Sequence, residues 1–316
     1  MATSPSTLEA KSLKKTTRMG AKIAKHWQLY LLLLLPLVYL LIFKYQPIYG
    51  VQIAFRDYSP AFGISGSPWV GFKHFQNFFS SYQFGRLLSN TLILGVYTLV
   101  ASIPFPILLA LSINSVRCKT LGKTAQMITY APYFISTVIL VSMITQILAV
   151  RGGLLNNVLA IFGIEPVNLM ASPTAFRHIY VISNIWQGTG YNAVIYIAAL
   201  AGINPELYEA ARIDGASIWQ RLRYIDLPGI SSVAIMLLIL NCGSIINISY
   251  EKVLLLQNDM NMETADVIST YVYRMGITSA QYSYSAAIGL FNSVVSVILL
   301  LLVNAAAKRF SDTSLF

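Results

Sequence analysis

The chain has 316 residues, of which 56% are hydrophobic and 11% are charged, and its formal net charge is +10. Soluble domains carry charge on about 25% of their residues, so this composition argues against a large soluble core of buried helices. The mean hydropathy of +0.62 indicates a surface that is largely solvated by lipid.

The basic residues do not indicate nucleic-acid binding, because most of them gather on one predicted side of the membrane. They lie in the N-terminal tail and in the loops that share its side, around Arg117, Lys123, Arg212 and Arg221, and near the C-terminus at Lys308. This positive-inside bias predicts a multi-pass membrane protein with both termini in the cytoplasm.

In chain order, residues 1–26 form a basic polar tail, and residues 27–316 form the predicted membrane domain. Runs without charged residues predict six spans, each near the length of about 20 residues that a bilayer requires. These spans cover about residues 28–43, 87–113, 125–149, 179–201, 230–250 and 280–306. The predicted fold class is all-α and integral to the membrane, with a bend in the second span at Pro104 and Pro106.

The outer segment 44–86 follows the first span and is rich in aromatic residues and glycines. It could lie along the membrane surface or pack over the helix bundle, and most of its rings suit an interfacial belt. The charges predicted on the outer side are expected to be solvated loop residues, although any of them could contact a partner protein or attract an acidic ligand. They include Arg56, Lys73, Arg86, Arg151, Arg177, Lys252 and Arg274.

Residues 204–228, between the fourth and fifth spans, form a cytoplasmic loop with the pattern of two short capped helices. Asn204 can cap the first helix and Gly215 can end it in a left-handed conformation. Ser217 and Gln220 match a capping box for the second helix, and Pro228 is expected to end that helix. Such short helices need a surface to dock on, which could be the membrane, this chain or a soluble partner.

The pattern of Glu209-Ala210-Ala211, Asp214-Gly215-Ala216 and Leu227-Pro228 resembles the signature of binding-protein-dependent ABC permeases. Within that family the chain is similar to sugar permeases of the maltose-importer type. The segment 45–58 resembles a branch that handles oligosaccharides released from polyuronides such as alginate or pectin. The resemblance implies the type I importer permease fold, with a coupling helix in this loop, and a place in the bacterial cytoplasmic membrane.

The resemblance also implies the partners and the site that contacts them. These partners are a second homologous permease, an ATPase dimer and an extracytoplasmic solute-binding protein, with the bilayer around them and an oligosaccharide as substrate. We expect no cofactor in this chain, because ATP and Mg²⁺ would bind the ATPase. The residues expected at the ATPase contact are Glu209, Ala210, Ala211, Asp214, Gly215, Ala216, Trp219, Leu227 and Pro228.

A sugar path requires hydrogen-bonding side chains inside a helix bundle. The fourth and fifth spans supply candidates in Asn184, Gln187, Tyr191, Asn192, Asn241 and Asn247. Three of them, Asn184, Gln187 and Tyr191, share one helical face, although hydrogen bonds between helices would explain such residues equally well.

The sequence gives little support to other functions. It contains no set of residues placed for catalysis and no metal-ligand pattern, so we expect neither an enzyme nor a metalloprotein. Half of a secondary solute transporter is the alternative, but the predicted spans lack the acidic or basic residues that ion coupling usually requires.

Overall fold

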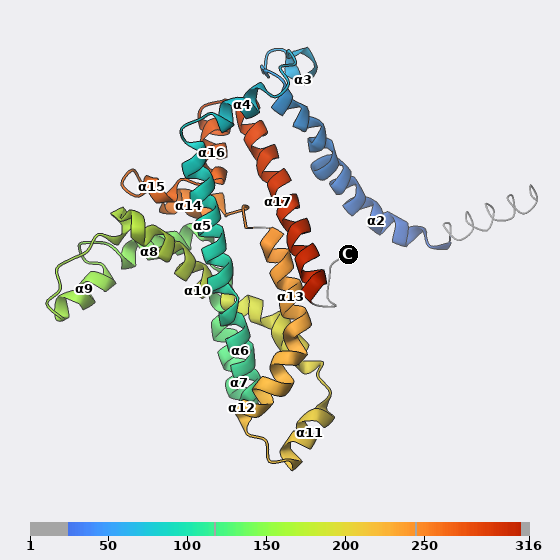
Figure 1. Ribbon diagram of the computed structural model, residues 1–316, viewed down its shortest axis with the longest axis vertical. Helices are drawn as coiled ribbons and strands as arrows, with labels where there is room; N and C mark the ends of the chain where they lie inside the picture. The colour runs from blue at the N-terminus through green and yellow to red at the C-terminus, as the bar shows by residue number, and fades with distance from the viewer. Residues whose placement is uncertain (1–24, 117, 244, 311–316) are drawn as a thin grey trace, which may run out of the picture.

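The computed structural model describes residues 25–116, 118–243 and 245–310, so the predicted tail lies almost wholly outside the described part. The described residues form helices joined by short loops, with an isolated β-bridge between Arg56 and Trp69. Five helices make an elongated bundle (Figure 1). They are α5 (Phe84–Ser102), α6 (Pro104–Ser115), α10 (Pro173–Ala201), α13 (Leu227–Gly243) and α17 (Tyr282–Phe310).

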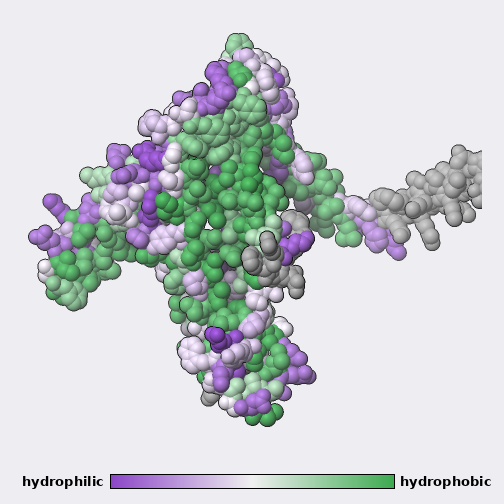
Figure 2. Space-filling model, in the orientation of Figure 1, coloured by the Kyte–Doolittle hydropathy of each residue, from purple (hydrophilic) through white to green (hydrophobic). Residues whose placement is uncertain are grey.

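Four helical stretches in the described residues are long and apolar enough to cross a membrane. They are Trp27–Phe55, Phe84–Ser115, Ile218–Gly243 and Tyr282–Lys308. Helix α10 has 29 residues, but its central polar side chains keep it outside this set. Hydrophobic residues cover most of the middle of the molecule between more polar ends (Figure 2). This distribution suits a bundle whose long sides face lipid.

The first helical stretch runs further than the predicted first span. It combines α2 (Trp27–Leu40), a π-helical turn (Leu41–Tyr45) and a 3₁₀ segment (Gln46–Phe55). Its first half leans away from the bundle and buries none of its side chains (Figure 1). The 3₁₀ segment packs against α17, and the Tyr58 amide donates a hydrogen bond of 2.8 Å to the Ser283 hydroxyl. The outer segment, which also contains α3 (Gly63–Gly66) and α4 (Lys73–Phe79), therefore covers the end of the bundle.

The third predicted span is sharply bent. Helix α7 (Lys119–Tyr130) and a 3₁₀ turn (Ala131–Phe134) meet α8 (Thr137–Ile147) at 98°. A short arm with α9 (Leu154–Ile161) follows, and a 3₁₀ turn (Leu169–Ala171) leads into α10. Gly190 permits α10 to approach α7, since a Cβ atom there would lie 2.0 Å from the Thr129 carbonyl oxygen.

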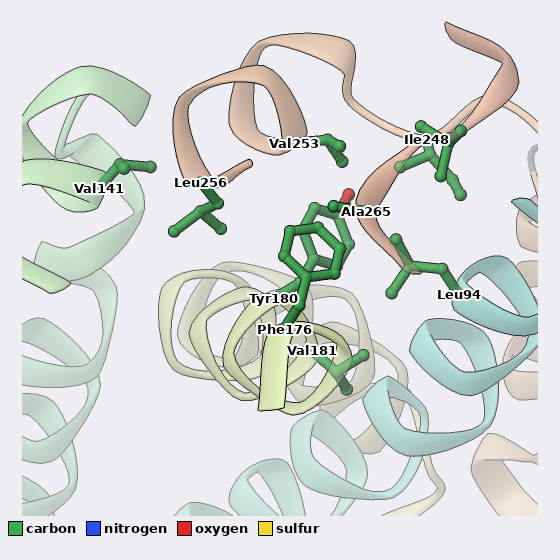
Figure 3. Packing of buried hydrophobic residues seen from close by; sticks show 10 residues of the cluster. Leu94, Val141, Phe176, Tyr180, Val181, Ile248, Val253, Leu256 and Ala265 are labelled. Atoms are coloured by element: carbon green, nitrogen blue, oxygen red, sulfur yellow. The ribbon is translucent and has the colours of Figure 1, made fainter. Parts of the chain in front are cut away.

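In the fifth predicted span, the helix ends at Gly243, before the predicted end at residue 250. Residues 245–249 are not helical. Short helices then connect α13 to α17. They are α14 (Tyr250–Leu256), α15 (Met262–Ala265), α16 (Ile268–Tyr273) and a π-helical turn (Arg274–Thr278). The apolar core fills the space between α10, α5 and α14, where Phe176 and Tyr180 of α10 meet Val253 and Leu256 (Figure 3).

Candidate functional site

The loop between α10 and α13 protrudes from one end of the molecule and carries α11 (Pro205–Ile213) and α12 (Ile218–Arg221) (Figure 1). The predicted caps are confirmed. The Asn204 side chain accepts a hydrogen bond from the Glu206 amide, and Gly215 ends α11 with φ +73°. The Ala216 amide donates to the Ala211 carbonyl at 2.8 Å, which completes a Schellman motif.

The predicted capping box is also present. The Ser217 amide donates to Gln220 Oε1 at 2.7 Å, and the Gln220 amide donates to Ser217 Oγ at 3.3 Å. The expectation that Pro228 ends this helix is wrong, because the helix continues through a π-helical turn (Leu222–Asp226) into α13. Wider i→i+5 hydrogen bonding just before Pro228 accommodates a residue that lacks an N–H group.

Large apolar side chains are exposed at this protruding end. Ile213 is 86% exposed and Trp219 is 81% exposed, and Leu207 and Ile218 are each about half exposed. The capped helices hold these side chains on a rigid frame instead of burying them in the chain itself. Exposed apolar groups at the tip of a protrusion are typical of a docking surface for another protein.

A hollow of about 970 Å³ lies between α11, α12 and the ends of α6 and α10. Glu209, Gly215 and Ala216 from the predicted coupling residues border it. At its inner wall Tyr208 donates a hydrogen bond to the buried Asp226 carboxylate. Burial, together with this carboxylate, raises the pKa of Tyr208 to about 12, so the hydroxyl remains a donor at physiological pH.

A second cavity, of about 340 Å³, lies inside the bundle between α5, α6, α10 and α13. Four of the six predicted sugar-path residues line it: Asn184, Asn192, Asn241 and Asn247. The non-helical stretch 245–249 forms part of its wall, which suits the rule that irregular backbone at membrane depth lines a cavity. Gly95 permits this stretch to approach α5, because a Cβ atom there would lie 2.2 Å from the Ile245 carbonyl oxygen.

The other two predicted residues lie outside this lining. Gln187 donates to the Ile135 carbonyl at the bend between α7 and α8, over 3.1 Å. Tyr191 stacks on Tyr133 with ring centroids 3.9 Å apart. The helical face shared by Asn184, Gln187 and Tyr191 is therefore divided between the cavity and contacts between helices.

Several lining residues were missed by the sequence reasoning, including Thr98, Tyr180 and Ser249. Asn247 also receives a 3.0 Å hydrogen bond from Asn292 Nδ2 on α17, which ties the irregular stretch to that helix. The signal available for Thr98 was a polar residue within an apolar span, but such residues are common. Lys252, expected in solvent, is buried at 2% exposure.

Membrane-length helices around a polar cavity, with a rigid helical loop projecting from one end, define a membrane transport subunit. The chain belongs to the family of binding-protein-dependent transport system inner membrane components, whose model matches residues 84–312. It is therefore a multi-pass permease subunit of an ABC importer.

Two relatives from Bacillus subtilis (strain 168) resemble the chain over most of its length. The polygalacturonan/rhamnogalacturonan transport system permease protein YteP is 42% identical, over 96% of this chain and 94% of the relative. Protein LplB is 44% identical, over 94% of this chain and 93% of the relative.

A solved structure shares the fold. It is a bacterial ABC transporter involved in the import of the acidic polysaccharide alginate, and its matching chain is 40% identical with a TM-score of 0.85. The match covers 93% of this chain and 99% of that chain. The same transporter type has also been solved in complex with an alginate pentasaccharide-bound periplasmic protein. The chain thus has the type I importer permease fold that the sequence resemblance implied.

Proposed function

We propose that this chain forms one half of the translocation path of an ATP-driven importer for oligosaccharides, and that these sugars are acidic. The observation that carries this proposal is the cavity of about 340 Å³ inside the bundle, which four asparagines line together with other polar residues such as Thr98 and Ser249. Amide groups both donate and accept hydrogen bonds, as sugar hydroxyls require. The relatives named for polygalacturonan and alginate transport support the acidic class.

Energy for transport would come from a separate ATPase dimer that binds ATP and Mg²⁺. We place its contact at α11 and α12, where Trp219 and Ile213 are exposed. In this proposal the loop end and both termini face the cytoplasm. A second homologous permease completes the path, and a solute-binding protein delivers the sugar to the opposite end.

The proposed mechanism treats the loop as a lever. Closure of the ATPase dimer would move α11, and the Tyr208–Asp226 hydrogen bond would pass this movement to the base of α13. Helix α13 lines the cavity through Asn241, so its tilt would change which end of the cavity is open. Only the difference in binding free energy between these two states can drive the cycle.

The test is reconstitution of this chain in liposomes with its partner permease, ATPase and binding protein. Oligogalacturonides or alginate oligosaccharides, added with binding protein, should stimulate ATP hydrolysis. Glu209→Lys should abolish the stimulation, whereas Glu165→Lys, a matched change on an exposed residue of the arm that follows α9, should retain it. A chain that never associates with an ATPase would overturn the proposal and favour a secondary transporter.

A further inference from the structure

Lys252 holds a buried positive charge on α14. Its ammonium nitrogen donates to Asn184 Oδ1 at 2.7 Å and lies 3.5 Å from Gln187 Oε1. The same nitrogen lies 5.6 Å from the centre of the Tyr180 ring. These neighbours solvate the ammonium group, but amide oxygens and an aromatic ring carry no formal charge and do not neutralise it.

No carboxylate in the described residues forms an ion pair with Lys252. Helix α14 packs against α8, α10 and α16, and these three helices contain no Asp or Glu. The neighbouring residue Glu251 is exposed. The buried Asp266, by contrast, is paired with Arg274 at 2.8 Å and with Arg86 at 3.6 Å. The fold therefore compensates the charge of Asp266 and leaves that of Lys252 without a counter-charge.

This charge lies directly behind the wall of the polar cavity. Asn184, which accepts the hydrogen bond from Lys252, is itself a lining residue, as are Tyr180 and Ser249. The position is fixed, because the next residue, Val253, packs into the core beside Tyr180 (Figure 3). Lys252 itself is 2% exposed, so its ammonium group is shielded from solvent and lies one amide group away from the cavity.

We propose that Lys252, acting through Asn184, is a specificity-determining residue that makes the cavity favour oligosaccharides bearing carboxylates over neutral ones. The inference rests on the proposed function and deepens it. An unpaired charge acts strongly on an anion in a low-dielectric interior, and an amide bound to an ammonium group becomes a better N–H donor. A neutral sugar gains little from the charge itself. Buried charges inside membrane proteins are costly and commonly mark substrate pathways.

A purely structural role would give a different result. If Lys252 only tied α14 to α10, its loss would reduce the transport of every sugar to the same extent. The test therefore compares two sugars of equal length that differ in charge, namely trigalacturonate and its fully methyl-esterified form. Sugar-stimulated ATP hydrolysis is measured in the complete reconstituted complex with wild type, Lys252→Met and Lys252→Arg.

The quantity of interest is the rate of each variant relative to wild type, measured for each sugar. The same binding protein serves every variant, so its own preference cancels in this ratio. Lys252→Met should lose about tenfold with trigalacturonate, the size expected for one charge-assisted contact. It should stay within about twofold of wild type with the ester, and Lys252→Arg should retain most of the acidic-sugar rate.

Equal losses for both sugars in Lys252→Met would overturn the inference and leave Lys252 as a tie between helices. Equal losses of the acidic-sugar rate in the Met and Arg variants would also overturn it, because Arg keeps the charge. A wild-type complex stimulated neither by these two sugars nor by alginate oligosaccharides is a separate outcome. It would overturn the proposed function, and the inference would fall with it.

Discussion

Tyr208, in the middle of α11, donates a hydrogen bond to the Asp226 carboxylate at the base of α13. Asp226 is 3% exposed and also accepts a longer hydrogen bond, of 3.5 Å, from Asn114 Nδ2 of α6. The protruding loop is thus joined to two helices of the bundle at a single carboxylate. A connection of this kind lets a force on α11 reach α13 without bending the loop between them.

Tyr208→Phe should therefore weaken the coupling between ATP hydrolysis and transport. The variant keeps the ring but leaves the buried carboxylate without its main donor, at a cost of about 1–3 kcal/mol. We expect more ATP to be hydrolysed for each sugar imported by the reconstituted complex. Tyr224→Phe is the matched control, since Tyr224 lies on the same loop and is 71% exposed. A Tyr208→Phe complex that hydrolyses as much ATP for each imported sugar as wild type would contradict the lever mechanism.

Gly215→Ala should damage the same loop in a different way. Gly215 has φ +73°, and an alanine there costs about 1 kcal/mol because its Cβ crowds the backbone. We expect α11 to fray at its end and sugar-stimulated ATP hydrolysis to fall, with membrane insertion unchanged. Gly85→Ala is the control, because a Cβ atom there meets nothing within 4 Å and the residue is helical. Equal activities of the two variants would show that the turn at Gly215 is not needed for coupling.

The features that the sequence predicted well are local ones. The caps at Asn204 and Gly215 and the capping box of Ser217 and Gln220 each depend on residues within a few positions of one another. Their hydrogen bonds are present as predicted. Long charge-free runs similarly predicted apolar helices, because the bilayer requires them whatever the tertiary packing is.

The features that were missed depend on contacts between distant segments. The non-helical stretch 245–249 lies against Gly95, about 150 positions earlier, and the bend after Phe134 is bridged by Gln187. Burial of Lys252 depends in the same way on Asn184 and on the core around Val253. A hydropathy pattern records which residues avoid water, but it does not record which helices meet.

The orientation of the chain can be tested with its own cysteines. Cys118 is exposed, on the side proposed to be cytoplasmic, and Cys242 is buried. With Cys242→Ser, a membrane-impermeant maleimide should label Cys118 in inverted vesicles and not in right-side-out cells. Tyr82→Cys, at a residue 87% exposed on the other side, should give the reverse pattern in a Cys118→Ser background. Labelling of Cys118 from outside intact cells would reverse the proposed topology.

If Lys252 acts as proposed, transport of acidic sugars and folding should have opposite pH dependences. Burial lowers the pKa of Lys252 from 10.5 to about 8, and the ring of Tyr180, which also titrates, lies beside its ammonium group. The ammonium form is therefore lost in the folded protein as pH rises through about 8, while the unfolded chain keeps its proton up to about 10.5. Because the unfolded state then binds more protons, the stability contributed by this site rises with pH over the same interval.

Import of trigalacturonate should consequently fall between pH 7 and 9, relative to import of its methyl ester. Lys252→Arg should remove this fall, because arginine remains charged over the whole interval. Thermal unfolding of wild type should move to higher temperature from pH 8 to 10, compared with Lys252→Met at each pH. A fall in acidic-sugar import that persists in the arginine variant would assign the pH dependence to another group. If transport and stability instead decreased together, general unfolding would explain both.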